Sequence, residues 1–367
     1  MRVAVFSDTY FPQVNGVSVI LGKMKDYMQQ NGIEYVYFVP GQKAESGVFT
    51  FGGAKFPLYP ELLITMPSYH KIAKLLDDFK PDVVHLATEF SLGWQGMKYA
   101  LRRGLPLTST YHTNFVQYLG YYGMPFLEKP GWRYLRWFHK RCVINFCPSM
   151  STLRLLEEHG IPNLRFCPHG IDSHLFNPAY RNEAIRLRYI DDPQDIILLY
   201  VGRIAPEKDL EVLMEAARLL NRHGLKFRLL MVGDGPSRPK LEGQRIDNVI
   251  FCGYQRGQDL YALYASADIF VFPSVTETFG NVILEAMASG LPVVAAPNGG
   301  VEDNLLPGRN GLAFKAGDAR DMAVQIEKLA AQPEVRQILA QGALEHARSR
   351  NWDSILADFY QAMGELI

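Results

Sequence analysis

The sequence has few cysteines and no pattern that would join them in a metal site. Its four cysteines among 367 residues form no C-x-x-C pair and no tight cluster with histidine, so no zinc site is indicated. No run of about 18 apolar residues is present, so no membrane-spanning helix is expected. The chain opens on a strand-like run, Arg2–Phe6, instead of a signal peptide. These absences favour a reducing, cytosolic setting.

The chain also lacks a net charge, because 38 Lys and Arg balance 38 Asp and Glu. The charge is nevertheless unevenly shared. Residues 1–170 hold 18 Lys and Arg against 12 Asp and Glu, whereas residues 171–367 hold 20 against 26. A basic half can mark an anionic partner, although solvated surface charges explain the same asymmetry. No nucleic-acid partner is expected.

Strand patterns alternate with helix patterns along both halves of the chain. Val3–Ser7 and Ile196–Val201 read as strands, and Val17–Gln30 and Leu210–Leu220 read as helices after them. This alternation predicts an α/β fold with parallel sheets that helices cover on both faces. The length of the chain favours two such domains.

The predicted join between the domains is the polar, proline-marked stretch of residues 171–194. We expect residues 1–172 to form one doubly wound domain and residues 173–350 to form the other. Residues 351–367 read as a C-terminal helix, with docking back on the first domain as one option that periodicity does not decide. Ligands of such folds bind at the carboxyl ends of the strands. Chemistry is therefore expected in the loops that follow strands.

The stretch Phe272–Glu285 places two carboxylates beside the start of a helix. An apolar strand ends at Phe272, and the next helix would open at Phe279, Gly280 and Asn281. The unpaired N–H groups of a first helical turn bind phosphate. A nucleotide sugar has phosphates for the helix end and hydroxyl groups for Glu277 and Glu285. The stretch therefore predicts a nucleotide-sugar site.

A second loop supplies cations. Arg203 and Lys208 lie five residues apart in Gly202–Asp209, directly after the predicted strand Ile196–Val201. A guanidinium fork and a mobile ammonium suit a diphosphate. The alternative is a pair of solvated surface cations beside a capping Asp209.

Three further positions give weaker signals. Gly16 precedes a helix, where it is either a close approach to phosphate or a plain turn. Gly233 lies in a glycine-rich turn for which a structural role with modest ligand contact is favoured. Tyr254 follows another strand, where its ring either holds a nucleobase or is an ordinary loop aromatic.

His112 ends a strand in the first half, beside the polar residues Thr113 and Asn114. These neighbours favour a functional histidine over a buried core histidine. The segment 116–141 that follows interleaves aromatic and basic residues, which is typical of a membrane interface and also of a helix that covers a core. The candidates for contact with an acceptor are Asn15, His112, Asn114, Tyr118 and Trp132.

Together these motifs resemble the retaining glycosyltransferases of family GT4, which have the two-domain GT-B fold with an interdomain cleft. The resemblance rests on the E-x7-E pair within Pro273–Val294, and on Gly202-Arg203 with Lys208, Val232–Gly235 and Asn298–Gly300. In the first half it is looser, and is carried by Asp8–Val17 and Tyr111–Thr113. These motifs are most similar to those of sulfoquinovosyl-diacylglycerol synthases, glycolipid glucosyltransferases and GDP-mannose-dependent mannosyltransferases.

The resemblance implies a role for each residue. His112, Arg203, Lys208 and Glu277 would form the catalytic set. Arg203 and Lys208 would bind the diphosphate, Glu285 the ribose, Glu277 the hexose, and Gly16 the distal phosphate. The family's same-face route needs no metal, and no D-x-D motif occurs in the loops, so no cofactor is expected.

The sequence thus predicts a hexosyltransferase that moves a hexose from a UDP- or GDP-linked donor to a lipid or glycan hydroxyl. It would be cytoplasmic, with a peripheral position on an anionic membrane through segment 116–141 as an option. A nucleotide-sugar 2-epimerase or hydrolase of similar fold is one alternative. A catalytically silent nucleotide-sugar binding protein is the other.

Overall fold

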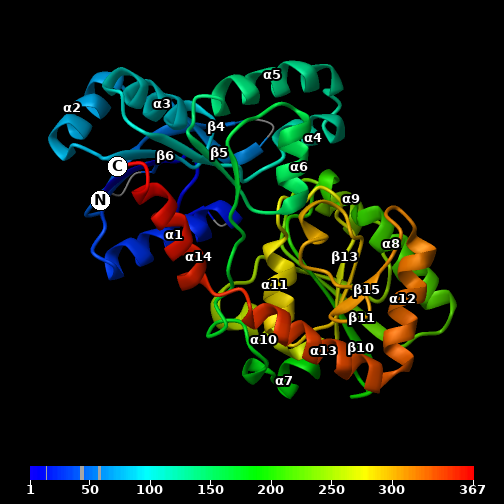
Figure 1. Cartoon of the computed structure of the whole chain (residues 1–367). Coiled ribbons are helices and arrows are strands. Elements are labelled where there is room, and N and C mark those ends of the chain that lie inside the picture. Colours follow the sequence, from blue (N-terminus) through cyan, green and yellow to red (C-terminus); the bar gives the residue numbers. More distant parts are fainter. Residues whose placement is uncertain (14, 42–44, 57–58) are drawn as a thin grey trace. The chain divides into compact units, whose positions relative to one another are not determined.

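The chain forms two compact units in a computed structural model that describes residues 1–13, 15–41, 45–56 and 59–367. Each unit is built around a parallel sheet flanked by helices (Figure 1), which confirms the predicted α/β class. The first unit contains Met1–Thr113, Phe126–His169 and Trp352–Ile367. The second contains Asn114–Pro125 and Gly170–Asn351.

The first unit has a seven-stranded sheet in the order β3-β2-β1-β6-β7-β8-β9, with every neighbouring pair parallel. Residues Val3 to Phe6 of the interior strand β1 are fully buried, as a strand covered on both faces requires. The strand order reverses at β1 and β6, so the loops after these two strands flank the switch point of the sheet. The strands are β1 (Arg2–Phe6), β2 (Glu34–Pro40), β3 (Val48–Phe51), β6 (Val83–Leu86), β7 (Leu107–Thr110), β8 (Ile144–Cys147) and β9 (Leu164–Phe166).

Six α-helices and one hairpin accompany this sheet in the described residues of the first unit. The hairpin pairs β4 (Gly53–Phe56) with β5 (Tyr59–Thr65) in antiparallel fashion. Its helices are α1 (Gly16–Gln30), α2 (Tyr69–Phe79), α3 (Ser91–Arg103), α5 (Glu128–His139), α6 (Met150–Glu158) and α14 (Trp352–Gly364), with the short η1 (Pro125–Leu127) before α5.

The last helix, α14, belongs to the core of this first unit. The ring of Phe359 lies 4.3 Å from that of Phe146 and 5.3 Å from that of His85. Tyr360 stacks on Tyr27 of α1 at 5.4 Å. Aromatic burial of this kind joins the end of the chain to residues far away in sequence.

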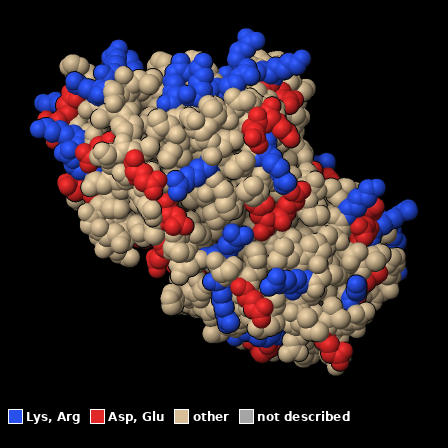
Figure 2. Space-filling model, in the orientation of Figure 1, with Lys and Arg blue, Asp and Glu red and all other residues tan. Residues whose placement is uncertain are grey.

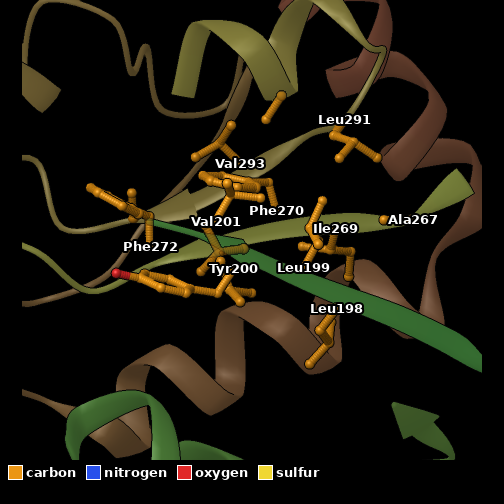
Figure 3. Close-up of a cluster of buried hydrophobic side chains, with 14 of the residues drawn as sticks. Leu198, Leu199, Tyr200, Val201, Ala267, Ile269, Phe270, Phe272, Leu291 and Val293 are labelled. Atoms are coloured by element: carbon orange, nitrogen blue, oxygen red, sulfur yellow. The ribbon is translucent and has the colours of Figure 1, made fainter. Parts of the chain in front are cut away.

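The second unit has a six-stranded parallel sheet in the order β12-β11-β10-β13-β14-β15. The apolar side chains of its two central strands fill the core (Figure 3), where Tyr200 and Phe272 stack at 5.9 Å. The strands are β10 (Ile196–Val201), β11 (Phe227–Val232), β12 (Val249–Gly253), β13 (Ile269–Phe272), β14 (Val293–Ala295) and β15 (Gly311–Ala313).

Eight α-helices accompany this sheet among the described residues. One of them, α4, is contributed by the separate segment Asn114–Pro125. The helices are α4 (Phe115–Tyr121), α7 (Glu183–Arg186), α8 (Leu210–Arg222), α9 (Arg238–Glu242), α10 (Gly257–Ser266), α11 (Asn281–Ala288), α12 (Ala319–Ala331) and α13 (Pro333–Arg348), with the short turns η2 (Pro178–Tyr180), η3 (Pro206–Lys208) and η4 (Gly299–Val301).

Candidate active site

The loops after β10 and β13 carry the charged residues that the sequence singles out. These two strands are neighbours, and the strand order of the second unit reverses between them. Open parallel sheets bind their ligands at this kind of reversal. Arg203 and Lys208 follow β10, and Glu277 follows β13, so both loops open at the same edge of the sheet.

Lys208 and Glu277 form the tightest contact of these loops. The Lys208 Nζ lies 2.5 Å from Glu277 Oε1, and the Ser274 hydroxyl donates to the same oxygen at 2.7 Å. Burial acts to lower the pKa of Lys208, but Glu277, with smaller contributions from Tyr200 and Glu207, outweighs burial and raises that pKa above the ordinary value. Lys208 is therefore charged, and its ammonium has further N–H donors for a phosphate oxygen.

Arg203 is held by a carboxylate that the sequence reading did not single out. Its Nη1 lies 3.2 Å from Oε1 of Glu207, a side chain that is only 1% exposed. Glu207 stands between the two cations in the η3 turn, and Arg203 lies four residues before it. The i,i+4 spacing of Arg203 and Glu207 is the sequence signal that could have indicated this ion pair.

The start of α11 is shaped by backbone conformation. Gly280 precedes the helix with a φ of +82°, a left-handed conformation that favours glycine. Phe279 is buried, and its carbonyl accepts a hydrogen bond from Asn304 at 2.8 Å. Asn281 is the first residue of the helix. The first turn of α11 therefore follows directly on the Glu277 loop.

Two glycines hold this loop from the other side. A Cβ on Gly299 would lie 2.6 Å from the Glu277 carbonyl oxygen, and one on Gly300 would lie 2.4 Å from Phe279 backbone atoms. The Gly300 N–H also donates to the Glu277 carbonyl. This close approach explains the predicted Asn298–Gly300 motif, because no side chain fits there.

A similar contact supports the Arg203 loop. A Cβ on Gly233 would lie 2.0 Å from the carbonyl oxygen of Gly202, and the Ile204 N–H donates to the Asp234 carbonyl at 2.9 Å. Gly233 thus packs closely against the start of the loop that carries Arg203 and Lys208. Tyr254 stands 55% exposed after the edge strand β12.

Glu285, on α11, is partly buried and bonded to a tyrosine. The hydroxyl of the fully buried Tyr264 donates to Glu285 Oε2 at 2.8 Å. Burial raises the pKa of Glu285 from 4.5 to about 7, although the Tyr264 hydrogen bond acts in the opposite direction. Tyr264 was not singled out from the sequence, since it lies on the preceding helix, α10, 21 residues before Glu285.

In the first unit, the loop after β1 is tied to the start of α3. The buried Asp8 accepts hydrogen bonds from the Ser91 hydroxyl at 2.6 Å and the Leu92 N–H at 2.8 Å. Asn15 caps α1 by accepting the Ser18 N–H at 2.9 Å. Gly16 is the exposed first residue of that helix.

The acceptor-side candidates differ in position. His112 follows β7, is 8% exposed, and has its ring 6.1 Å from that of His169. Burial, with smaller effects of His169 and His85, lowers its pKa well below the ordinary value, so the imidazole is neutral.

The remaining three lie in both units. Asn114 and Tyr118 belong to the second unit, where the Asn114 amide donates to the Thr276 carbonyl at 3.3 Å. Trp132 belongs to the first unit and stacks on His159 at 3.7 Å with 8% of its surface exposed, so little of the ring is available to a ligand. Among the described residues, no group of three or more His, Cys, Asp or Glu is placed to hold a metal ion.

Comparison with known proteins places the chain in a family. Residues 195–332 match the family described as glycosyl transferases group 1, and residues 14–175 match glycosyltransferase family 4. A GDP-mannose-dependent alpha-mannosyltransferase of Mycobacterium tuberculosis is 34% identical over 87% of this chain and 85% of its own length. The chain belongs to glycosyltransferase family 4.

Two other proteins agree with this assignment. An alpha-monoglucosyldiacylglycerol synthase of Streptococcus pneumoniae is 28% identical over 98% of this chain and 85% of its own length. The structure of sucrose-phosphate synthase from Thermosynechococcus elongatus has the same fold, with a TM-score of 0.82, 22% identity, and coverage of 100% of this chain and 98% of the other. The predicted GT-B fold and the predicted branch of the family are confirmed.

The family 4 transferase is a hexosyltransferase, as the sequence predicted. The relatives are transferases and synthases, so the epimerase, hydrolase and silent-binding alternatives are not favoured.

The pKa of Glu285 leads to a prediction about stability. The unfolded chain releases this proton near pH 4.5 and the folded chain near pH 7, so the free energy of unfolding falls as pH rises through that window. The substitution Glu285→Gln removes this pH-dependent contribution to the free energy of unfolding. Thermal unfolding at pH 5, 6, 7 and 8 is therefore expected to favour the variant increasingly over the wild type.

The matched control is Glu334→Gln, the same change at an exposed position of α13. Its melting temperature should differ from that of the wild type by the same amount at every pH. A pH-independent difference for Glu285→Gln as well would contradict the assignment.

Proposed function

We propose that this transferase moves mannose from GDP-mannose to a hydroxyl group of a lipid or glycolipid acceptor, with retention of the anomeric configuration. The observation that carries the proposal is the Lys208–Glu277 contact beside Arg203 at the strand reversal of the second unit. The name of the mycobacterial relative supports the GDP-linked donor. A UDP-linked hexose is the competing donor, which the name of the glucosyl relative leaves as the alternative.

In the proposed reaction, the bond between the sugar C1 and the diphosphate oxygen breaks while a bond from C1 to the acceptor oxygen forms on the same face. The acceptor proton passes to the departing phosphate. Negative charge grows on the diphosphate, and the charged Lys208 and Arg203 would stabilise it. Glu277 would accept hydrogen bonds from the hexose and hold it in register. Its Oε2 makes no hydrogen bond within the described part of the chain, so that oxygen is available to a sugar hydroxyl.

A neutral His112 fits the same proposal. An uncharged imidazole can accept or donate a hydrogen bond to a sugar hydroxyl. Gly16 would supply an N–H from the first turn of α1 to the distal phosphate. Glu285 would bind the ribose.

The surface around α5 supports a lipid acceptor. Residues 126–141 contain five Lys and Arg against one acidic residue, and basic side chains gather over α5 in Figure 2. Phe126 is 72% exposed, and Lys129, Arg133 and Trp137 line a hollow of about 460 Å³. Aromatic and basic groups together suit an anionic lipid interface. No helix in the described ranges has the length and apolar character needed to cross a membrane.

The donor is tested by thermal unfolding with GDP-mannose, UDP-glucose, GDP and UDP. A ligand that binds only the folded state raises the melting temperature. At a ligand concentration 100 times the Kd, it adds about 2.7 kcal/mol to the free energy of unfolding. GDP-mannose and GDP should stabilise the wild type, and Arg203→Gln should reduce both shifts. Stabilisation by the uridine compounds alone would contradict the GDP-linked donor. Proton NMR of the product should show the donor's anomeric configuration, and an inverted product would refute retention.

Membrane association is tested by co-sedimentation with vesicles that contain anionic lipid. The wild type should sediment at low salt and be released at high salt, because screening weakens exposed charges. The double variant Lys129→Gln/Arg133→Gln should bind roughly tenfold or more weakly, since each basic residue contributes about 1 kcal/mol. Arg320→Gln/Lys328→Gln on α12 removes the same charges elsewhere and should bind like the wild type. Failure of the wild type to sediment at any salt concentration would exclude the lipid surface.

A further inference from the structure

The α4 segment, Asn114–Tyr122, is fastened to the loops that carry the charged residues of the second unit. The Asn114 amide donates to the Thr276 carbonyl, one residue before Glu277. Burial and the nearby carboxylate of Asp209, the residue after Lys208, raise the pKa of the Tyr121 phenol. The hydroxyl of Tyr122 donates to Glu207 Oε2 at 3.2 Å. Two hydrogen bonds therefore join one short segment to both loops.

Glu207 is the residue at which these contacts converge. Its Oε1 accepts from Arg203 at 3.2 Å and its Oε2 accepts from Tyr122. Its own carbonyl accepts from the Thr276 hydroxyl at 3.0 Å, which ties the η3 turn to the Glu277 loop. With 1% of its side chain exposed, this carboxylate has exchanged water for these donors.

A buried carboxylate next to a diphosphate site is costly unless it does something for the site. Its charge partly cancels the two cations that would attract the donor, and it costs desolvation. The Glu207 carboxylate weakens binding of the donor before reaction. Its presence is explained if it fixes the direction of the Arg203 guanidinium. Two anchors at its two oxygens restrict the carboxylate, and the carboxylate restricts Arg203.

We propose that Glu207 is a positioning residue for hexosyl transfer, which holds Arg203 in the direction of the departing diphosphate and is itself fixed by Tyr122 of the α4 segment. The inference rests on the proposed function, because it deepens the role given there to Arg203. Arg203 touches the diphosphate, whereas Glu207 acts only through it. Because Tyr122 fixes Glu207, full activity requires that the α4 segment be in place.

The test compares Glu207→Gln with the wild type in two measurements. The first is kcat for hexose transfer from GDP-mannose, which should fall about 10-fold to 100-fold, since misplacement of a catalytic group costs rates of this order. The second is the Kd for GDP by titration calorimetry. It should stay the same or decrease, because the variant removes a negative charge beside Arg203 and Lys208.

A double-mutant cycle isolates the route through Arg203. Losses at residues that act as one unit are not additive. Arg203→Gln/Glu207→Gln should therefore transfer no more slowly than Arg203→Gln alone. Tyr122→Phe should lower kcat in the same direction as Glu207→Gln, and the two changes together should do no more than Glu207→Gln. The matched control is Glu211→Gln, an exposed glutamate four residues later on α8, which should keep wild-type kinetics.

Each remaining outcome overturns the inference. A kcat of Glu207→Gln within twofold of the wild type removes the role. Additive losses in the cycle place its effect elsewhere. A weaker Kd for GDP together with a lower melting temperature shows a merely structural carboxylate. In all three cases an active wild type and an active Glu211→Gln leave the proposed function standing. If the wild type transfers no hexose from any tested nucleotide sugar, the proposed function and this inference fail together.

Discussion

The contact between Lys208 and Glu277 is the interaction on which the second unit's site depends. It joins the loop after β10 to the loop after β13, and so connects two neighbouring strands at the reversal of the sheet. A buried ion pair contributes little net stability, and breaking one leaves a charge without its partner. The Thr276 hydroxyl also donates to the Glu207 carbonyl at 3.0 Å, which joins the same two loops a second time. The arrangement is therefore better explained by the binding of an anionic, hydroxylated ligand than by stability.

The sequence was sufficient to locate the charged loops, because it shows both the βα alternation and the residues directly after each strand. Parallel topology then brings those residues to one edge of a sheet. The partners of these residues were not predictable. Tyr122 meets Glu207 across 85 positions, and Tyr264 meets Glu285 across 21. Such pairs depend on how distant segments pack, and no local pattern encodes that packing.

Several elements escaped the sequence reading for local reasons. The helix α13 begins at Pro333, which suits a first turn because its missing N–H needs no partner there. The same helix contains Gly342, where a Cβ would lie 1.9 Å from the Arg309 carbonyl oxygen. Proline and glycine lower the apparent helical signal, although both fit the folded structure. The aromatic segment 116–141 read as one stretch, yet the chain divides it between the two units near Pro125.

The central claim is that a charged Lys208 stabilises the departing diphosphate. It is tested most directly by the steady-state rate of hexose transfer by Lys208→Gln, with circular dichroism to establish that the variant is folded. Loss of one group that stabilises developing negative charge typically lowers kcat by about 10²-fold to 10³-fold. The account predicts a decrease of that size in kcat at saturating donor. A folded variant that keeps kcat within a few-fold of the wild type would contradict it.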